Sequence, residues 1–369
     1  MCVKGEESAF GDGIGDLGGR RRRLRIAGCL LAGVLVVGAG GAGWAFWRLN
    51  HNIESVDIDA ALGDNRPAKI RSSPESSASD SASDQSTSDP SASASAEALP
   101  SGALNILVLG SDSRSGRENA KLGGGDEGAG ARSDTAMVVH IDEGRTGATV
   151  VSIPRDTLVT RPSCPLESGG STAVAYNVMF NSAYAVGGPV CAVKTVESMT
   201  DVRMDHYIEI DFSGFAKLVD ALGGVTVTTD EDIDDEDSHL SLRAGTHHLD
   251  GEQALALART RHGIGDGSDL GRIGLQQKLV KALLDQISST DLLTNPARLY
   301  RAADAITGSL TTDTGLDSLT ELTGLGESVR GLSSAATRTV MMPVVTAPYD
   351  RNRVVADEPE ASRLWESLR

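Results

Sequence analysis

The hydrophobic pattern changes along the chain and divides it into three parts. Residues 26–46 form an unbroken apolar run that contains no charged side chain. Residues 72–100 contain almost no large apolar side chain, and after residue 103 short apolar runs alternate with amphipathic segments. This pattern predicts an apolar segment, then a stretch that cannot build a core, and then a folded region.

The folded region mixes two kinds of periodicity. Continuous apolar runs are typical of strands buried on both faces. We expect strands at Leu104–Leu109, Ala136–Ile141, Thr149–Ile153, His206–Asp211, Val225–Thr228 and Thr339–Val345. Helical spacing predicts helices at Ala175–Val186, Pro189–Met199, Phe212–Leu222, Gly251–Ala258, Asp269–Ser288, Pro296–Thr307 and Leu316–Val329, and a short one from about Glu358. Together they predict an α/β fold, a three-layer α-β-α domain with a mixed central sheet.

The apolar run indicates a membrane anchor. It follows an arginine cluster that ends at Arg25, and as a helix it would span roughly 30 Å, the thickness of a hydrocarbon core. We therefore expect a cytoplasmic tail at 1–25, a transmembrane helix at 26–47 and a single-pass protein of the cell membrane. A cleaved signal peptide is the alternative, although such peptides have apolar cores of only about 7–15 residues.

The Ser/Ala/Asp-rich stretch lacks the apolar surface needed to offset the entropy of folding. We expect residues 48–102 to form a flexible, disordered extracellular linker that lifts the folded part off the membrane. Residues 103–290 would then form the core of the outer domain, and residues 291–369 the C-terminal part of the same extracellular domain.

Composition narrows the possible partners. The 369 residues carry a formal net charge of −17, and only 4% of them are aromatic. Nucleic-acid binding depends on Lys and Arg to neutralise phosphates and on aromatic rings to stack on bases. We therefore expect no nucleic-acid partner.

Three polar residues share one face of the helix predicted from Asp269. Asp269, Arg272 and Gln276 lie at positions i, i+3 and i+7, beside apolar residues such as Ile273. Burying a charge is costly, so these side chains need partners or a ligand. An internal Asp–Arg pair that fixes the helix start and a ligand site are both open.

Arginines also gather at the ends of predicted strands, where open α/β sheets usually bind ligands. They are Arg114, Arg132, Arg155, Arg259 and Arg261. Each alone is typical of a solvated surface. Because the planar guanidinium fork fits phosphate oxygens, their presence together in an acidic domain indicates an anionic ligand.

Acidic residues suggest a metal. Asp112 and Asp134 flank a long Gly-rich segment, and two hard carboxylates beside arginines suit Mg²⁺ or Mn²⁺ shared with phosphates. Helix capping and turn formation are the alternative roles. The acidic run Asp230–Asp237 fits no calcium loop, and we expect it to form a solvated hairpin tip.

Cys164 and Cys191 lie beyond the predicted anchor, in a compartment where disulfides persist. Their spacing matches no redox motif, so we predict a structural disulfide.

Taken in order, these segments resemble the LytR-CpsA-Psr family of cell-wall glycopolymer ligases. The resemblance covers about residues 104–285. It rests on Asn105-Ile106-Leu107, Gly110–Arg114, Arg132–Thr135, Ser152–Thr157, Asn181–Tyr184, Gly187-Gly188, Asp205–Tyr207, Asp211–Phe215, Asp220–Val225, Leu249–Leu255, Arg259–Arg261, Asp269–Arg272 and Gln276-Gln277.

The resemblance implies an enzyme and makes residues 103–290 its catalytic core. The donor would be a glycopolymer linked through diphosphate to a polyprenyl lipid, and the acceptor would be peptidoglycan or a glycosylated surface protein. By position, Asp112 and Asp134 would hold Mg²⁺ or Mn²⁺, and Asp269 would orient the arginines. The phosphates would be bound by Arg114, Arg132, Arg155, Arg259, Arg261, Arg272 and Gln276.

The sequence departs from the family in two places. Leu275 stands where arginine often precedes the paired glutamines, and the segment between Arg114 and Arg132 is longer and richer in glycine. Three other functions stay open. They are a polyprenyl-diphosphate pyrophosphatase, a membrane-bound transcription attenuator and a non-catalytic glycan-binding protein.

Overall fold

The computed structural model describes residues 43–64, 66–69, 102–111, 133–166, 168–261, 269–289 and 296–369. The chain divides into two compact units, residues 1–51 and Asn52–Arg369. In the first unit, the described residues form a helix over 43–51. The predicted membrane span lies outside the described residues except for 43–47. Within the described ranges, the structure has no helix that is both long enough and apolar enough to cross a membrane.

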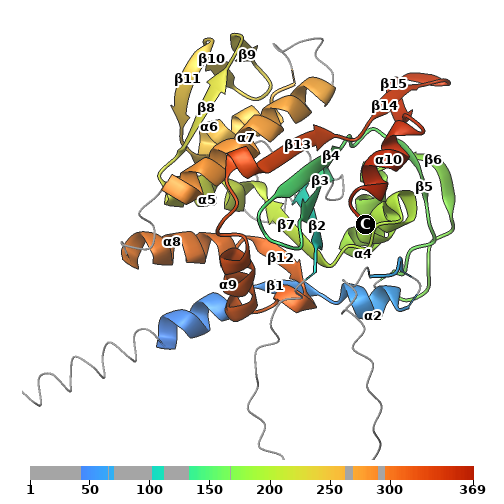
Figure 1. The fold of residues 1–369 in the computed structure, drawn as a ribbon, viewed down its shortest axis with the longest axis horizontal. Helices are drawn as coiled ribbons and strands as arrows, with labels where there is room; N and C mark the ends of the chain where they lie inside the picture. Colours follow the sequence, from blue (N-terminus) through green and yellow to red (C-terminus); the bar gives the residue numbers. More distant parts are fainter. Residues whose placement is uncertain are drawn as a thin grey trace, which may run out of the picture. The chain divides into compact units, whose positions relative to one another are not determined.

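A mixed β-sheet forms the centre of the second unit (Figure 1). Within the described residues its strands follow the order β1 (Glu54–Val56), β12 (Leu310–Asp313), β7 (His206–Asp211), β2 (Leu104–Ser111), β3 (Ser133–Ile141), β4 (Ala148–Ile153) and β13 (Thr337–Met341). The pairs β1–β12, β7–β2 and β4–β13 are parallel, and the other neighbouring pairs are antiparallel. The predicted α/β fold with a mixed central sheet is confirmed.

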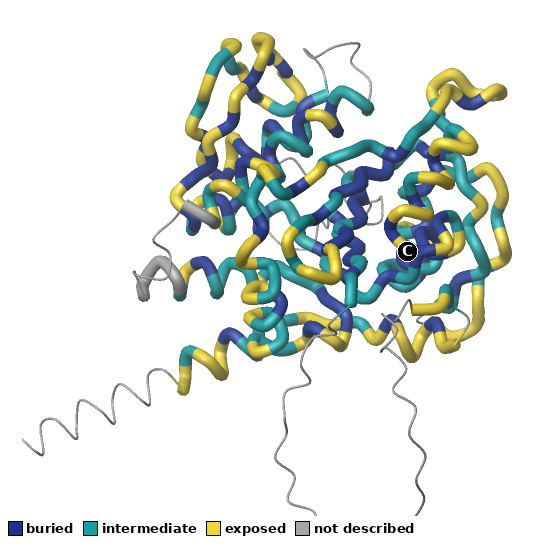
Figure 2. Tube along the Cα trace, viewed as in Figure 1, coloured by how far each residue is buried: buried dark blue, intermediate teal, exposed yellow. Residues whose placement is uncertain are grey.

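The central strands are buried on both faces because their side chains alternate between two apolar cores. In β2, Leu107 faces the core that contains α4 (Asn181–Thr200), whereas Ile106 faces the core that contains α9 (Leu319–Ser328). Figure 2 shows the central strands mostly in the colour of buried residues. Helices therefore cover both faces of the sheet, as the continuous apolar runs predict.

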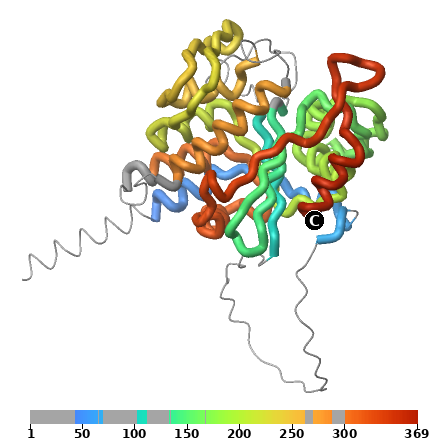
Figure 3. Tube along the Cα trace, turned by 45° about the horizontal axis from the view of Figure 1, so that its top comes forward, coloured from blue at the N-terminus to red at the C-terminus, as the bar shows by residue number. Residues whose placement is uncertain are grey.

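The remaining elements surround this sheet. The other helices are α2 (Ile58–Leu62), α5 (Phe212–Leu222), α6 (Gly251–Arg259), α7 (Asp269–Ser289), α8 (Pro296–Thr307) and α10 (Glu360–Glu366), with short 3₁₀ turns at Thr314–Leu316 and Ser334–Ala336. Short antiparallel pairs form from β5 (Leu158–Arg161) with β6 (Ala175–Met179), β8 (Val225–Thr229) with β11 (Gly245–Leu249), β9 (Ile233–Asp235) with β10 (Leu240–Leu242), and β14 (Val344–Ala347) with β15 (Asp350–Ala356). Figure 3 shows β8–β11 and α7 on one side of the central sheet and the β14–β15 hairpin on the other.

The structured domain begins well before residue 103. β1 pairs in parallel with β12, and α2 buries Ile58 and Leu62 in the same core as α4. The prediction that residues 48–102 form one flexible linker is therefore wrong for its first part. The sequence signal is weak there because β1 and α2 are short, and such elements are stable only through tertiary contacts.

Arg66 fastens this N-terminal segment to the domain. Its guanidinium donates to both carboxylate oxygens of Glu197 in α4, with Nη2 2.6 Å from Oε1. It also donates to the carbonyl oxygen of Met204 at 2.7 Å. Both charged side chains of the Arg66–Glu197 pair are only 3% exposed, so each charge offsets the cost of burying the other.

The two described ends of the Ser/Ala/Asp-rich stretch meet at one place. Residues 67–69 and 102–103 line the same cavity of about 320 Å³, where Lys69 forms an ion pair with Asp205 at 2.6 Å. The chain is therefore already docked on the domain on both sides of this stretch, whose own residues 70–101 lie outside the described ones.

The region predicted as the helix Ala175–Val186 begins instead as a strand. Ala175–Met179 pairs with β5, and α4 starts at Asn181. Pairing across the hairpin overrides the local helical pattern. Inside α4, Gly188 has φ +60°, and the resulting kink precedes Pro189. This kink explains why the sequence pattern breaks between 186 and 189.

Two other differences involve strands. The predicted strand Thr339–Val345 is divided between β13, in the central sheet, and β14, which pairs with β15. The sequence analysis also missed short strands whose pairing is set by tertiary contacts. These are β1, β5, β6, β9, β10, β11, β12 and β15.

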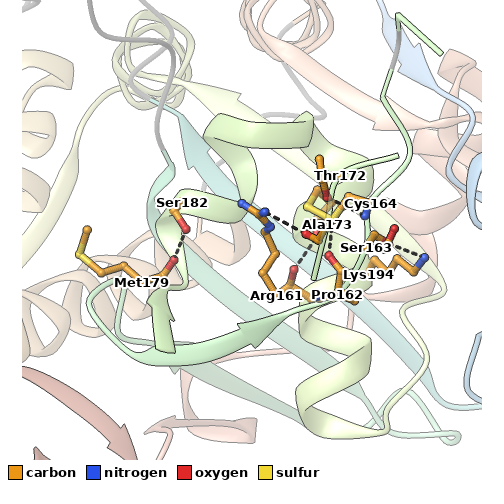
Figure 4. The surroundings of a disulfide bond; sticks show 11 residues. Arg161, Pro162, Ser163, Cys164, Thr172, Ala173, Met179, Ser182 and Lys194 are labelled. Carbon is orange, nitrogen blue, oxygen red and sulfur yellow. Dashed lines mark hydrogen bonds between the residues drawn. A yellow bond between two sulfur atoms is a disulfide. The ribbon is translucent and has the colours of Figure 1, made fainter. Parts of the chain in front are cut away.

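A disulfide bond joins Cys164 to Cys191 in α4, with the two Cα atoms 5.2 Å apart (Figure 4). Both cysteines are fully buried. Hydrogen bonds hold the surrounding loop in place. The backbone N–H of Cys164 donates to Thr172 Oγ1 at 3.0 Å, and Lys194 Nζ donates to the carbonyl oxygen of Ser163 at 2.8 Å. The loop after β5 is therefore attached to α4 by covalent and polar contacts.

Candidate active site

Two arginines lie at the C-terminal end of α6. The helix starts at a capping box headed by Asp250, and Arg259 is its last residue. Thr260 caps the end, and Arg261 follows it. The C-terminus of a helix carries partial negative charge, which favours cations there. The Arg259 guanidinium lies 5.2 Å from the ring centroid of Phe212, in a cation–π contact.

α7 supplies two further polar side chains from its buried face. Arg272 and Gln276 are both buried. Gln276 Nε2 donates to Thr135 Oγ1 in β3 at 2.9 Å and to the carbonyl oxygen of Ala258 in α6 at 3.0 Å. One amide therefore ties α7 to both the sheet and α6, which fixes the position of this helix face.

These side chains line a single cavity of about 230 Å³, which we call the arginine pocket. Its lining residues are Thr135, Phe212, Asp235, Asp237, Ser238, Leu255, Ala258, Arg259, Arg261, Arg272 and Gln276. Arg259 of α6, Arg261 just beyond that helix and Arg272 of α7 thus share one cavity with two acidic residues. Among the described residues, the structure brings together Arg259, Arg261, Arg272 and Gln276, four of the residues that the sequence indicates for phosphate binding.

Asp235 belongs to this pocket, and the sequence analysis missed it. The acidic run Asp230–Asp237 was expected to be a solvated hairpin tip, but Asp235 is 2% exposed. Its Oδ2 accepts from the backbone N–H of Arg261 at 2.7 Å, and its Oδ1 accepts from the N–H groups of Asp237 and Ser238. The hairpin therefore holds the Arg261 backbone. In the sequence, nothing distinguishes Asp235 from its exposed acidic neighbours.

The strand register places the predicted metal ligands by their backbone. Ser111 pairs with Ser133 and Gly110 pairs with Thr135, so Asp134 is the extra residue of a β-bulge. Bulges commonly redirect a side chain next to an active site. Asp112 follows Ser111 directly in the sequence. The bulge at Asp134 lies at the end of the β2–β3 pair, next to Thr135, which accepts from Gln276.

Several predicted site residues lie outside what the structure describes. Asp112, Arg114 and Arg132 fall outside the described residues, and Asp134 and Asp269 are described by their backbone alone. Among the described side chains, no group of three or more His, Cys, Asp and Glu residues is arranged to hold a metal ion.

Arg155 lies in a neighbouring cluster and does not line the arginine pocket. It follows β4, and its Nε is 3.9 Å from Asp156 Oδ2. The same carboxylate accepts a second cation, since Arg353 Nη1 lies 3.5 Å from Asp156 Oδ1. Arg155 is thus not among the described residues that line the arginine pocket, and its assignment to the phosphates stays a prediction.

Leu275, the departure from the family pattern, faces away from the arginine pocket. It is buried in an apolar core with Leu257 of α6 and Leu279 of α7. At this position the chain gains packing between α6 and α7.

Comparison with known proteins identifies relatives of this chain. The LytR_cpsA_psr family model matches residues 68–369. The probable cell wall biosynthesis protein LcpB of Corynebacterium glutamicum is 33% identical over 95% of this chain and 75% of that protein. The polyisoprenyl-teichoic acid–peptidoglycan teichoic acid transferase TagT of Bacillus subtilis is 30% identical over 73% of each chain.

A solved structure of TagT bound to LI-WTA is also similar. It matches with a TM-score of 0.52 and 26% identity, over 72% of this chain and 89% of that one. The family model matches from Ala68 onward, so it covers the arginine pocket and the central sheet except for β1. From its matched length and from the residues of the pocket, the chain belongs to the LytR_cpsA_psr family.

Proposed function

We propose that this protein transfers a phosphoglycan from a polyprenyl-diphosphate carrier to peptidoglycan during cell-wall assembly. The arginine pocket is the observation that carries the proposal. Three arginines line it, and guanidinium groups are donors suited to a diphosphate. A cavity of about 230 Å³ holds a diphosphate but not a polymer, so the lipid and the glycan extend beyond it.

The relatives support the choice of substrates. TagT is named for a polyisoprenyl-linked teichoic acid donor and a peptidoglycan acceptor, and the similar solved structure holds LI-WTA. The donor class for this chain is accordingly a lipid-linked glycopolymer. A glycosylated surface protein is the alternative acceptor, and both acceptors offer a sugar hydroxyl.

The proposed reaction exchanges one phosphorus–oxygen bond for another. The acceptor oxygen attacks the phosphorus that carries the glycan, and the bond from that phosphorus to the bridging oxygen breaks. Polyprenyl phosphate leaves, and the proton of the hydroxyl is released with it. Phosphoryl transfer of this kind depends mainly on positioning and on neutralising charge. Arg259, Arg261 and Arg272 neutralise the phosphates, and Gln276 braces α7 against β3.

The positions of two aspartates fit a divalent cation. Asp112 and Asp134 adjoin paired residues of β2 and β3, and carboxylate oxygens are the ligands that Mg²⁺ and Mn²⁺ prefer. We propose that these two residues hold such a cation, which would stabilise negative charge on the diphosphate. We also propose that residues 26–47 anchor the protein in the cell membrane and that the domain lies outside the cell. A lipid-linked donor and the wall are both accessible on that side.

A reconstituted assay tests the function. The full-length protein in detergent or vesicles receives a labelled lipid-linked glycopolymer, with or without purified peptidoglycan. We expect covalent label on peptidoglycan, release of polyprenyl phosphate, loss of both after EDTA and recovery with Mg²⁺ or Mn²⁺. Release that proceeds equally without acceptor, with no label on peptidoglycan, would identify a pyrophosphatase and contradict the proposal.

A further inference from the structure

A second cavity opens beside the site, between two hairpins. It has a volume of about 600 Å³ and lies between the β5–β6 and β14–β15 pairs. We call it the hairpin groove. Its lining includes Leu158, Asn177, Ser182, Tyr349, Asp350 and Arg353. The proposed reaction needs two polymers, and the arginine pocket accounts for the head group of only one of them.

The hairpin groove adjoins the loop that follows β4 and contains Arg155. Arg353 from the groove and Arg155 from the end of β4 share the carboxylate of Asp156. The backbone makes the same connection, since the carbonyl oxygen of Arg155 accepts from the N–H of Asn181 at 3.2 Å. Thr157 also forms an isolated bridge with Val354 of β15. A ligand in the groove would therefore lie against the loop that follows β4.

This loop in turn borders the sheet edge that holds the arginine pocket. Ile153, at the end of β4, pairs with Ala136 of β3, and the adjacent Thr135 accepts from Gln276 in the pocket wall. Figures 1 and 3 show the β14–β15 hairpin and helices α6 and α7 at the same end of the central sheet. The loop after β4 thus connects the groove to β3, the strand that carries Thr135 of the pocket wall.

The chemistry of the hairpin groove suits a sugar chain. Tyr349 is 98% exposed at the turn between β14 and β15, and Tyr176, next to Asn177, is 71% exposed. Exposed tyrosines offer a flat apolar ring together with a hydroxyl, which is the combination that recognises amphipathic ligands. Asn177, Ser182 and Asp350 add hydrogen-bonding groups around an otherwise apolar wall.

We propose that the hairpin groove binds the acceptor, a glycan strand of peptidoglycan, and presents one of its sugar hydroxyls to the reaction centre. The inference rests on the proposed function. We assign the groove to the acceptor because it adjoins Arg155 and Asp156 in the loop after β4. The donor phosphates are assigned to a different place, among Arg259, Arg261 and Arg272.

The test uses the full-length protein and purified sacculi stripped of secondary polymers. Tyr349→Ala removes an exposed ring, and Tyr349→Trp retains an aromatic surface. Arg351→Ala is the matched control, because Arg351 is exposed on the same hairpin and does not line the groove. Sacculus binding and the KM values for acceptor and donor are measured for each variant.

We expect Tyr349→Ala to raise the acceptor KM and to weaken sacculus binding about five- to tenfold, the size of one lost aromatic contact. The donor KM should stay unchanged, Tyr349→Trp should restore binding, and Arg351→Ala should match the wild type. A rise in the donor KM instead would mean that the groove holds the donor glycan, which overturns the inference. Unchanged values for both substrates, or a wild-type protein that fails to bind sacculi, would overturn it as well.

The outcome separates this inference from the proposed function. Binding of sacculi that depends on Tyr349, in a protein that transfers no phosphoglycan, would leave the groove assignment standing and refute the transfer. Transfer that is independent of Tyr349 would support the proposed function and refute the assignment of the groove.

Discussion

At the scale of single residues, Arg272 is the most deeply buried of the described arginines in the arginine pocket, with 3% of its surface exposed. It lies one helical turn before Gln276, which is held by β3 and α6. A buried guanidinium is costly unless anionic or hydrogen-bonding groups surround it. We therefore expect Arg272 to contact the phosphates that the pocket is proposed to bind.

Arg272→Ala should lower kcat/KM for transfer by roughly 10²–10³-fold, the usual effect of removing one charge-stabilising group. Arg272→Lys should recover little, because an ammonium group lacks the planar fork of a guanidinium. Lys281→Ala, on the exposed face of α7, is the control and should behave like the wild type. Transfer at the wild-type rate by a folded Arg272→Ala protein would remove this residue from the site.

Asp235 should act through Arg261. It accepts three backbone N–H groups, one of them from Arg261, so Asp235→Ala leaves these donors without an acceptor and should cost about 1–3 kcal/mol of stability. Asp235→Asn retains one acceptor oxygen and should fold well, with a donor KM between those of the wild type and Asp235→Ala. The exposed Asp234 provides the control Asp234→Asn. Equal KM values in all four proteins would show that Asp235 has no positioning role.

Much of the described site could be predicted from residues alone. Arg259, Arg261, Arg272 and Gln276 lie in recognisable segments, and helical spacing puts the last two on one face. Asp235 could not be predicted, because its burial depends on a three-residue strand folding back over the end of α6. The contact of Arg353 with Asp156, the carboxylate that also pairs with Arg155, could not be predicted either, because Arg353 lies far away in the sequence.

At the scale of elements, residues 52–69 are an integral part of the domain. β1 extends the central sheet, α2 packs on α4, and the Arg66–Glu197 pair is buried between them. Apolar runs predicted the central strands well, because burial on both faces leaves no ambiguity of pattern. The short edge elements could not be predicted, since their pairing partners supply most of their stability.

Arg66→Met should destabilise the domain by about 3–5 kcal/mol, because it leaves the buried Glu197 carboxylate without its cation. Lys278→Met breaks an ion pair with Asp230 in which both side chains are exposed and should cost no more than about 1 kcal/mol. Urea unfolding measures both. If the two variants lose equal stability, Arg66 does not fasten the segment. A double variant Arg66→Met/Glu197→Met should recover part of the loss, because it also removes the stranded carboxylate.

At the scale of the whole molecule, one buried histidine should make stability depend on pH. Burial lowers the pKa of His140 below its ordinary value of 6.5, although Asp142 and Asp205 oppose this effect. The His140 ring lies next to Asn105, with the ring Nδ1 2.8 Å from the side-chain oxygen Oδ1 of Asn105. The unfolded chain therefore takes up the proton more readily than the folded one.

The contribution of His140 to stability should be complete above about pH 6.5 and should decline as the pH falls from there toward the lower pKa of the folded state. The free energy of unfolding, measured in urea at pH 7.5 and at pH 5.5, should fall less in His140→Gln than in the wild type. An identical decrease in both proteins would assign the pH dependence to other groups.

The central proposal is that the arginine pocket binds the phosphorylated head group of a polyprenyl carrier. Native mass spectrometry of the full-length protein, purified gently from membranes, tests this claim most directly. We expect a polyprenyl phosphate or diphosphate bound to the wild type and to Lys281→Ala, and its loss from Arg261→Ala/Arg272→Ala. The same lipid retained in equal amount by that double variant would contradict the claim.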